Sequence, residues 1–461
     1  MRVIICGAGQ VGTTIAKHLA SEGAHVTVVD TSPEQIRHID ANYDVRGMVG
    51  HASYPDVLRR AGAKDADMLI AVTRSDEVNM VACQVAYSLF KTKRRIARLR
   101  HSGYLAHDKS GLFASEHLPI DVIISPEIEI AEGIARRLRT PGAFDMLPMA
   151  NGLIDLLGLH IEMEGCIAAG ERVGDIVDGF ESEAVSILAI VRGGRCFVPD
   201  TNERLAPGDD VYILARHDRV PEIMLVFGHT EKVGRRVVLV GAGNVGLHLA
   251  QKLRSSTQGV DIKIIEYDAE RAEYVAQEMG ANAIVLQGDA LDRKLLQEAQ
   301  TGIADTIVAV TNDDETNIFA SVLAKQLGCR RAITLVNKRT YETLIPTLGI
   351  DAVVSPSAVT ISTVLRHVRR GAISALYTLR EDFGEIVEAE IDERSPLLRK
   401  PVHKLKLPDG LKIGAVVRGE EVFFPDANFA FEPADHVIAL VTYEALKAAD
   451  NLFGRGSRRT P

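Results

Sequence analysis

Residues 3–30 read VIICGAGQVGTTIAKHLASEGAHVTVVD, and residues 237–268 read VVLVGAGNVGLHLAQKLRSSTQGVDIKIIEYD. Each stretch contains an apolar run, a glycine-rich turn, a helical pattern, a second apolar run and then an acid. This order predicts a strand, a phosphate-binding turn, a helix and a second strand, the arrangement of a dinucleotide-binding Rossmann-like domain. The sequence therefore predicts two copies of one nucleotide-binding unit.

The glycines of each turn have separate predicted roles. Gly7 lets the chain turn out of the first strand, Gly9 leaves room for a pyrophosphate, and Gly12 lets the helix pack close to the sheet. The free N–H groups at the start of the helix then point at the phosphates. The predicted phosphate-binding residues are Gly7, Ala8, Gly9, Gln10, Val11 and Gly12 in the first copy and Gly241, Ala242, Gly243, Asn244, Val245 and Gly246 in the second.

An acidic residue ends the second predicted strand of each copy, Asp30 in the first and Glu266 in the second. A carboxylate here accepts hydrogen bonds from both hydroxyls of an adenosine ribose and repels a 2′-phosphate, so NAD(H) is favoured over its phosphorylated form. ATP and ADP contain the same ribose and are not excluded. The insertion RSSTQGVDIK before Glu266 leaves open the alternative that the second copy has lost its ligand and remains only as a packing unit.

The repeat continues beyond the glycine turns, where GHAS matches GDAL and AVTRSDEVN matches AVTNDDETN. These segments place His51 and Asp289 at the end of the third strand of their copies, near the expected adenine. Thr73 and Thr311 end the fourth strand, at the carboxyl edge where ligands bind in such sheets. In an alternative interpretation, these threonines and the aspartates three residues later simply cap the following helices.

The fifth predicted strand differs between the copies. Arg98, in IARLR, could reach a phosphate or could be a solvent-exposed charge on the strand. The matching stretch of the second copy, ITLVNKR, has apolar Leu335 or Val336 at this position. Arginine-dependent chemistry is therefore expected at the first site alone.

Each Rossmann-like copy is followed by a smaller segment with short strand patterns broken by glycine and proline. PGDDVYILAR from Pro207 is similar to PADHVIALVT from Pro433, so this segment is also duplicated. Short strands separated by turns indicate a small α+β domain. We therefore expect an α/β protein in which two Rossmann-like parallel-sheet domains are each followed by a small α+β domain. The expected domains are residues 1–124, 144–228, 234–354 and 372–455.

Length and composition fit a soluble protein with several domains. The chain has 461 residues, 46% hydrophobic and 25% charged, and its net charge of -9 argues against a nucleic-acid partner. No stretch approaches the roughly 18 consecutive apolar residues of a membrane span. The five cysteines are scattered without a CxxC pair, so neither a metal site nor a disulfide framework is expected. A reduced cytoplasmic compartment is the natural setting.

The series GAGQVG, VVD, GHAS and AVTRSDEVN, repeated and followed each time by a small strand-rich segment, resembles the regulatory subunits of bacterial Trk potassium-uptake systems. Those proteins are built from tandem regulator-of-potassium-conductance (RCK) domains, and the resemblance covers essentially the whole chain. It implies binding of NAD+ or NADH, and of ATP or ADP, and no catalysed reaction. It implies a homotetramer on the cytoplasmic face of the membrane, gating a separate potassium-transporting subunit. The implied site residues are the two glycine turns with Asp30, His51, Thr73 and Arg98, and with Glu266, Asp289 and Thr311.

Two other classes of function remain open from the residues. An NAD-dependent oxidoreductase would need a substrate domain with a proton-transfer group such as His or Lys beside the nicotinamide. The segments after the Rossmann-like copies are short for that purpose. The third class is a soluble scaffold whose Rossmann-like units no longer bind a ligand.

Overall fold

The computed structural model describes residues 1–21, 23–106, 111–114, 116–140, 142–163, 165–180, 185–229, 234–256, 259–342, 345–368, 373–380, 383–398 and 400–453. The described residues form two compact units. One unit contains residues 1–132 and 236–367, and the other contains the described parts of 133–235 and 368–461. Each unit therefore combines segments from both halves of the sequence.

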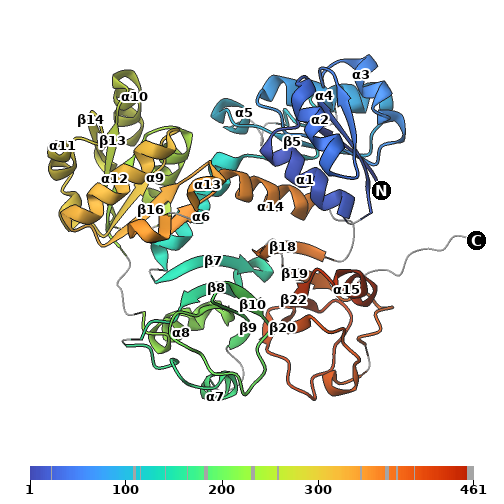
Figure 1. Ribbon diagram of the computed structural model, residues 1–461, viewed down its shortest axis with the longest axis vertical. Coiled ribbons are helices and arrows are strands. Elements are labelled where there is room, and N and C mark those ends of the chain that lie inside the picture. The colour runs from blue at the N-terminus through green and yellow to red at the C-terminus, as the bar shows by residue number, and fades with distance from the viewer. Residues whose placement is uncertain are drawn as a thin grey trace, which may run out of the picture. The chain divides into compact units, whose positions relative to one another are not determined.

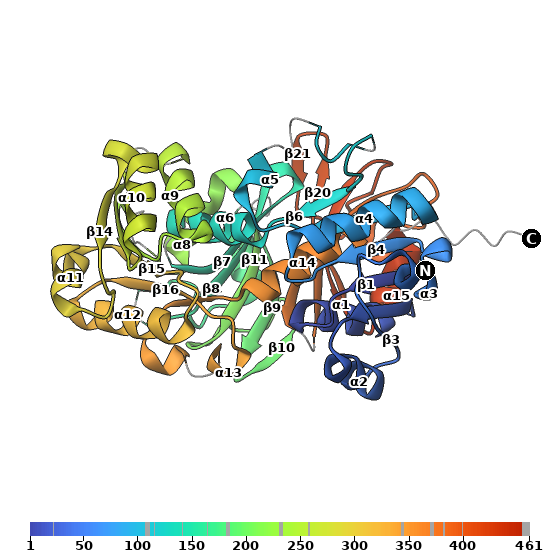
Figure 2. The same cartoon turned by 90° about the horizontal axis from the view of Figure 1, so that it is seen from above.

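The first Rossmann-like domain is a parallel sheet with flanking helices (Figures 1 and 2). Its described strands are hydrogen-bonded in the order β3-β2-β1-β4-β5-β6, so the strand order reverses between β1 and β4. The strands are β1 (Arg2–Cys6), β2 (His25–Asp30), β3 (Arg46–Val49), β4 (Met68–Ala71), β5 (Arg94–Arg98) and β6 (Val122–Ile124). The helices are α1 (Gln10–Ser21), α2 (Pro33–Asn42), α3 (Pro55–Arg60), α4 (Asp76–Phe90), α5 (Ser102–Ala106) and α6 (Pro126–Arg139).

Burial of both faces of this sheet explains the unbroken apolar runs of its central strands. Ile4 of β1 lies in one apolar cluster with Leu58 of α3 and Cys83 of α4. Helix α1 packs against β1 and β2 and buries Ile15 and Leu19. Because successive side chains of a strand point to opposite faces, a strand covered on both sides has to be apolar at every position.

The second Rossmann-like domain repeats this sheet, with the order β14-β13-β12-β15-β16-β17 among the described residues. The strands are β12 (Arg236–Val240), β13 (Asp261–Glu266), β14 (Ile284–Gln287), β15 (Thr306–Ala309), β16 (Arg331–Leu335) and β17 (Ala352–Val354). The helices are α9 (Asn244–Ser256), α10 (Ala269–Met279), α11 (Arg293–Glu298), α12 (Asp314–Leu327), α13 (Arg339–Glu342) and α14 (Pro356–Val368). Both Rossmann-like domains belong to one compact unit, in which Lys252 of α9 forms a 3.0 Å ion pair with Glu132 of α6.

The second compact unit contains two small antiparallel sheets, with the described strand orders β10-β9-β11-β8-β7 and β18-β19-β22-β20-β21. The first comprises β7 (Ala143–Met149), β8 (Ile154–His160), β9 (Val185–Arg192), β10 (Arg195–Phe197) and β11 (Asp210–Arg216), with helices α7 (Val173–Gly179) and α8 (Val220–Val226). The second comprises β18 (Ile373–Arg380), β19 (Gly384–Glu390), β20 (Leu411–Arg418), β21 (Glu421–Phe423) and β22 (His436–Thr442), with helix α15 (Leu446–Phe453). The expected fold class is confirmed. Residues 372, 454 and 455, at the ends of the last expected domain, lie outside the described residues.

The two small domains share an apolar core. Leu188 and Leu214 of the first small domain cluster with Ile386 and Leu440 of the second. A Cβ atom at Gly414 of β20 would lie 2.5 Å from a terminal methyl group of Leu188, so a larger residue there would have to displace that side chain. The small domains therefore form one folding unit, although about 230 residues separate their matching strands.

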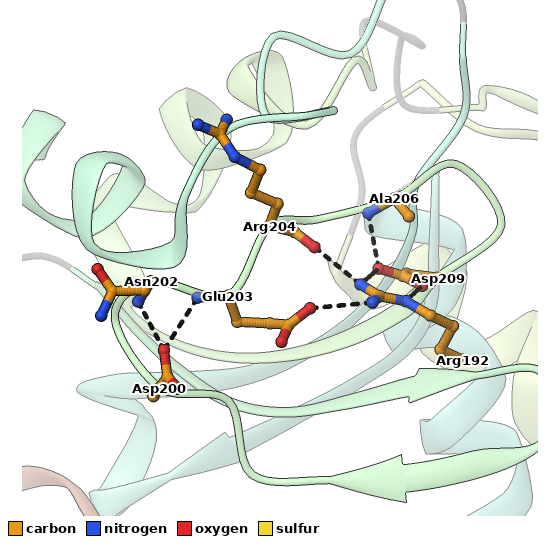
Figure 3. A network of polar contacts seen from close by, with 7 residues as sticks. All are labelled: Arg192, Asp200, Asn202, Glu203, Arg204, Ala206 and Asp209. Atoms are coloured by element: carbon orange, nitrogen blue, oxygen red, sulfur yellow. Dashed lines mark hydrogen bonds and ion pairs between the residues drawn. The ribbon is translucent and has the colours of Figure 1, made fainter.

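An arginine–aspartate clamp in each small domain explains why PGDDVYILAR and PADHVIALVT resemble each other, and Figure 3 shows the first of the two. The Arg192 guanidinium donates two hydrogen bonds of 2.8 Å to the fully buried Asp209 carboxylate and one of 2.9 Å to Glu203. In the second small domain, Arg418 donates to the buried Asp435 carboxylate at 2.7 and 2.9 Å. A buried carboxylate needs such a partner, because an unpaired charge away from water is costly. This repeat is therefore structural.

Lys412 of β20 gives a pH-dependent test of the shared core. Its ammonium group donates to the Pro199 carbonyl at 3.3 Å, and burial lowers its pKa from 10.5 to about 8. As the pH falls through this interval, the unfolded chain takes up the proton before the folded chain does, so stability is lost. We expect Lys412→Met to raise the free energy of unfolding near neutral pH by roughly 1–3 kcal/mol.

The measurement is chemical denaturation of the unmodified chain and of Lys412→Met at several pH values between about 8 and 10.5, the folded and unfolded pKa values of Lys412. The difference in unfolding free energy between Lys412→Met and the parent chain should shrink as the pH rises through this interval. A difference that does not change with pH would contradict the burial of this charge.

Candidate nucleotide-binding sites

Both glycine turns leave the sheet where the strand order reverses. β1 and β12 are central strands, and the turn after each leads directly into α1 or α9. In open parallel sheets, ligands bind in the crevice at this switch point. The first N–H groups of a helix have no partner within the helix, so α1 and α9 offer hydrogen-bond donors to an anion there.

The three glycines of each turn are required for different physical reasons. Gly7 has a φ of 112°, in the left-handed region that favours glycine. A Cβ atom at Gly12 would lie 1.9 Å from the Gly7 carbonyl oxygen, so α1 could not pack this closely with any other residue. A Cβ atom at Gly9 would meet no protein atom within 4 Å, which leaves open space for a ligand. Gly246 and Gly243 repeat the pattern, with a 2.0 Å contact to the Gly241 carbonyl oxygen and open space respectively.

The acid that ends the second strand is tied to the glycine turn in both copies. Asp30 accepts hydrogen bonds from the Ala8 N–H at 2.7 Å and, through its other oxygen, from the Ser32 N–H at 2.8 Å. Glu266 accepts from the Ala242 N–H at 2.6 Å and from the Asp268 N–H at 3.0 Å. Each carboxylate oxygen keeps acceptor capacity for a ribose hydroxyl, because a carboxylate has about four lone-pair sites. The structure therefore brings the predicted acid and turn together twice.

The buried asparagine of the Asp-Glu-x-Asn motif joins strands β4 and β5. Asn79 accepts hydrogen bonds from the Thr73 N–H at 2.9 Å and hydroxyl at 2.7 Å, and its amide donates to the Arg98 carbonyl at 2.8 Å. Thr311 and Asn317 repeat the first two contacts at 2.8 and 2.7 Å. Each threonine hydroxyl donates its hydrogen to the neighbouring asparagine side chain. Its oxygen can therefore only accept hydrogen bonds from a ligand.

The alternative in which Thr73 and Thr311 cap helices with the aspartates three residues later is wrong. The helix caps are Ser75 and Asp313, whose side chains accept from the N–H groups of Val78 and Thr316. The Asp76 carboxylate instead accepts from the N–H groups that follow β5, at 2.9 and 2.8 Å. The motif therefore shapes the loop after β5 at the carboxyl edge of the sheet.

The predicted base-contacting residue after the third strand of each sheet, His51 in one copy and Asp289 in the other, differs between the two copies. The Nδ1 atom of His51 lies 2.8 Å from the Ser53 hydroxyl, and its ring stacks on Tyr54 with 4.7 Å between the ring centroids. Asp289 instead accepts from the Leu291 N–H at 2.9 Å. A stacked imidazole and a carboxylate present different surfaces to a base, so the two sites are chemically unequal here.

Arg98 lies in a cleft of about 1010 Å³ within the unit formed by the two Rossmann-like domains. From the second domain the cleft is lined by Gly241, Gly243, Asn244, Glu266, Asp289 and Thr311, which are all predicted site residues. The Nε atom of Arg98 is buried and has no hydrogen-bond partner among the described residues. Burial, with the nearby charge of Arg100, lowers the pKa of the Arg98 guanidinium. The expectation that arginine chemistry belongs to the first site alone does not fit this placement.

Sequence reasoning missed a basic residue of the second site. Arg271 of α10 donates to the Ala242 carbonyl at 2.7 Å and lines the same cleft. The residue at the matching position of the first copy, three after the helix cap, is Gln35. No motif marks position 271. Aligning the two copies position by position would have revealed Arg271, because it replaces an uncharged glutamine.

The described residues contain no group of three or more His, Cys, Asp and Glu side chains that could hold a metal ion. Across the same residues, no helix combines the length and apolar character that a membrane crossing requires. Burial raises the pKa of the Cys6 thiol, beside the first glycine turn, to about 12. Cys6 is therefore a neutral packing residue near neutral pH.

These features define a protein with a duplicated Rossmann-like nucleotide-binding fold, each copy followed by a small α+β domain. The family model of the TrkA-N domain matches residues 3–126 and 237–356, and that of the TrkA-C domain matches residues 386–454. The chain is 42% identical over 453 residues to the Trk system potassium uptake protein TrkA of Azorhizobium caulinodans, covering 98% of both chains. It is 40% identical over 444 residues to the TrkA protein of Halomonas elongata, covering 96% of both. The chain belongs to the TrkA family.

Solved structures show the same fold over nearly the whole chain. The RCK domain of GsuK matches with a TM-score of 0.59 and 19% identity, covering 98% of this chain and 94% of that one. The GsuK channel bound to NAD matches with a TM-score of 0.60 and 18% identity, covering 98% of this chain and 78% of that one. At these identities the likeness supports the fold alone.

Alanine substitutions at Gly12 and at Gly9 add the same methyl group but should have different effects, the first on folding stability and the second on nucleotide binding. We expect Gly12→Ala to lower the free energy of unfolding by roughly 1–3 kcal/mol, because the methyl group overlaps the Gly7 carbonyl oxygen. Gly9→Ala should change stability by less than about 0.5 kcal/mol but weaken nucleotide binding at the first site about tenfold. Chemical denaturation and NADH fluorescence titration measure the two effects. Equal stability losses at both positions would contradict the assigned roles.

Proposed function

We propose that the chain is the nucleotide-sensing regulatory subunit of a potassium-uptake system. It binds NAD(H), and also ATP or ADP, at both Rossmann-like sites and gates a separate membrane subunit from the cytoplasmic face. It works as a homotetramer of four-module chains (1–124, 144–228, 234–354 and 372–455) and catalyses no reaction. The observation that carries this proposal is the repeated glycine turn, with open space beside Gly9 and Gly243 and an acid tied to each turn.

The proposed ligand contacts divide by chemistry. The N–H groups of residues 7–12 and 241–246 bind the phosphates, and Asp30 and Glu266 bind the ribose hydroxyls. His51 and Asp289 contact the base, and the oxygens of Thr73 and Thr311 accept hydrogen bonds at the far end of the ligand. Retention of every element of both turns supports two working sites over the vestigial-scaffold alternative.

Control of a transporter by these sites has to follow the rules of coupled equilibria. A nucleotide shifts a conformational equilibrium only by its difference in affinity for the two states. Couplings of about 1–3 kcal/mol would change transport about 5- to 150-fold. Because the two sites differ at positions 51 and 289 and at positions 35 and 271, different nucleotides can bias the same assembly.

An NAD-dependent oxidoreductase is the rival proposal. The sequence YEALK at residues 443–447 has the Tyr-x-x-x-Lys spacing of one type of proton-transfer pair, although it runs from the turn after β22 into α15. Steady NADH consumption with any metabolite, lost in Tyr443→Phe, would support the rival. We expect no NADH consumption beyond the background rate.

Asp30→Asn tests the proposed dinucleotide preference. The amide keeps one acceptor oxygen for the backbone but loses the charge that repels a 2′-phosphate. We expect NADH to bind roughly tenfold more weakly at the first site and the preference for NADH over NADPH to narrow. Fluorescence titration with both dinucleotides measures this, with unfolding curves as the folding control. An unchanged preference would contradict a ribose-binding role for Asp30.

The gating proposal is tested by ion flux. The chain is reconstituted in vesicles with the potassium-transporting membrane protein that co-purifies with it, and rubidium uptake is measured with ATP, ADP, NADH or no nucleotide. We expect uptake to differ at least fivefold between nucleotides, and this difference to disappear when both Gly9 and Gly243 are replaced by glutamate. Equal flux under all conditions would contradict gating.

A further inference from the structure

A basic surface lies on the first Rossmann-like domain, at the edge of the sheet opposite the glycine turn. In a parallel sheet each helix ends at the edge where the next strand begins, so α3 and α4 end opposite the carboxyl edge that carries Gly7 and Asp30. Five exposed basic residues gather at these two helix ends. We call them the basic face: Arg59, Arg60, Lys64, Lys91 and Lys93.

The basic face joins two segments that are about 30 residues apart in the sequence. Helices α3 and α4 contact each other, and both contact the short turn Ala63–Asp65. The buried hydroxyl of Thr92 donates to the Ala63 carbonyl at 3.1 Å and so ties residues 91–93 to this turn. The five side chains therefore belong to one surface.

Most of this positive charge is not neutralised within the protein. The side chains of Arg59, Arg60 and Lys64 form no ion pair or hydrogen bond with any residue that the structure describes. The Lys93 ammonium group lies 3.6 Å from the Asp67 carboxylate. Exposed cations without acidic partners create a positive potential that attracts an anionic partner.

The second Rossmann-like domain lacks this face, although its strands and helices are the same. The residues that match the five above, in the same order, are Gln297, Glu298, Gly302, Gly328 and Arg330. Lys91 caps α4 with a φ of 56°, a left-handed conformation that favours glycine, and the matching cap of α12 is Gly328. The fold therefore does not require the charges of the basic face.

We propose that the basic face binds the anionic headgroups of a phospholipid bilayer. Leu89, in the last turn of α4 and two residues before Lys91, is 58% exposed. An exposed apolar side chain among basic residues is typical of surfaces that lie on anionic membranes. The net charge of -9 on the whole chain disfavours a nucleic acid as the partner.

The choice of a bilayer rests on the proposed function, which places the chain at the cytoplasmic face of a membrane. Anionic lipids of that leaflet attract basic residues. A chain bound through the basic face holds the first glycine turn away from the bilayer, because the two lie at opposite edges of one sheet. Nucleotide can then enter and leave the first site while the chain stays on the membrane.

The test is sedimentation of the full-length chain with protein-free vesicles. One set contains phosphatidylcholine alone, and in the other set phosphatidylglycerol replaces a third of it. We expect binding to the anionic vesicles alone, and weaker binding as salt is added, because ions screen the attraction between exposed charges. Equal binding to both sets, or to neither, would overturn the inference.

A matched pair of variants locates the contact. Arg59→Gln combined with Arg60→Gln should weaken binding to anionic vesicles roughly 25-fold, because each basic residue near such a surface contributes about fivefold. The control is Lys17→Gln combined with Arg37→Gln, which removes two exposed charges from α1 and α2, on the other face of the same sheet (Figure 2). The control should change binding less than about threefold.

The variants also separate a local contact from total charge and from folding. Arg59→Lys combined with Arg60→Lys keeps both charges and should bind as the unmodified chain does. Unfolding curves check that every variant folds. Equal losses in the glutamine variant and in the control would overturn the inference, because vesicle binding would then follow the total charge of the chain.

Three further outcomes distinguish this inference from the proposed function. A DNA duplex that binds as tightly as the anionic vesicles, and is lost in the same glutamine variant, would overturn the inference, because the face would then accept any polyanion. Binding only to vesicles that contain the co-purifying potassium-transporting subunit would overturn the inference and leave the proposed function standing. Equal rubidium uptake with every nucleotide, together with the expected lipid binding, would overturn the proposed gating alone.

Discussion

The close contact between the glycine turn and the first turn of its helix is the constraint on which both sites depend. Gly12 and Gly246 approach the carbonyl oxygens of Gly7 and Gly241 so closely that no side chain fits between them. This contact fixes the helix start over the end of the central strand, where its N–H groups converge on one point. Phosphate binding needs that convergence, because single N–H groups are weak ligands compared with several acting together.

Around this fixed point the two copies are free to differ. Asp30 and Glu266 hold the same place, with one carboxylate oxygen on the turn in each copy. Near the ligand-binding edge of the sheet, His51 of the first copy is replaced by Asp289 in the second, Gln35 by Arg271, and Arg98 by Leu335. Duplication thus preserves the part that geometry dictates and varies the part that selects the ligand. The small domains behave differently, because their repeated Arg–Asp clamps and their shared core serve stability. Figure 3 shows the first of these clamps, between Arg192 and Asp209.

Local patterns predicted the fold because each is tied to a short-range physical cause. The strand, turn and helix at each glycine motif follow from residue spacing, and both sheets have the parallel strands and flanking helices that the apolar runs indicate. The same local reasoning failed where contacts are long-range. The capping role of Asp76 was inferred from its neighbours in sequence, whereas its carboxylate accepts from N–H groups 24 and 25 residues away. The placement of Arg98 beside the second turn depends on how the two halves pack, which no motif encodes.

The most direct test of the central claim, that both copies are working nucleotide sites, is to count bound nucleotides per chain by native mass spectrometry. The account predicts two per chain in the unmodified protein when NADH and ATP are supplied together. It predicts one per chain when either glycine turn carries a glutamate at Gly9 or Gly243. A single bound nucleotide per chain at saturation, or none, would contradict the account.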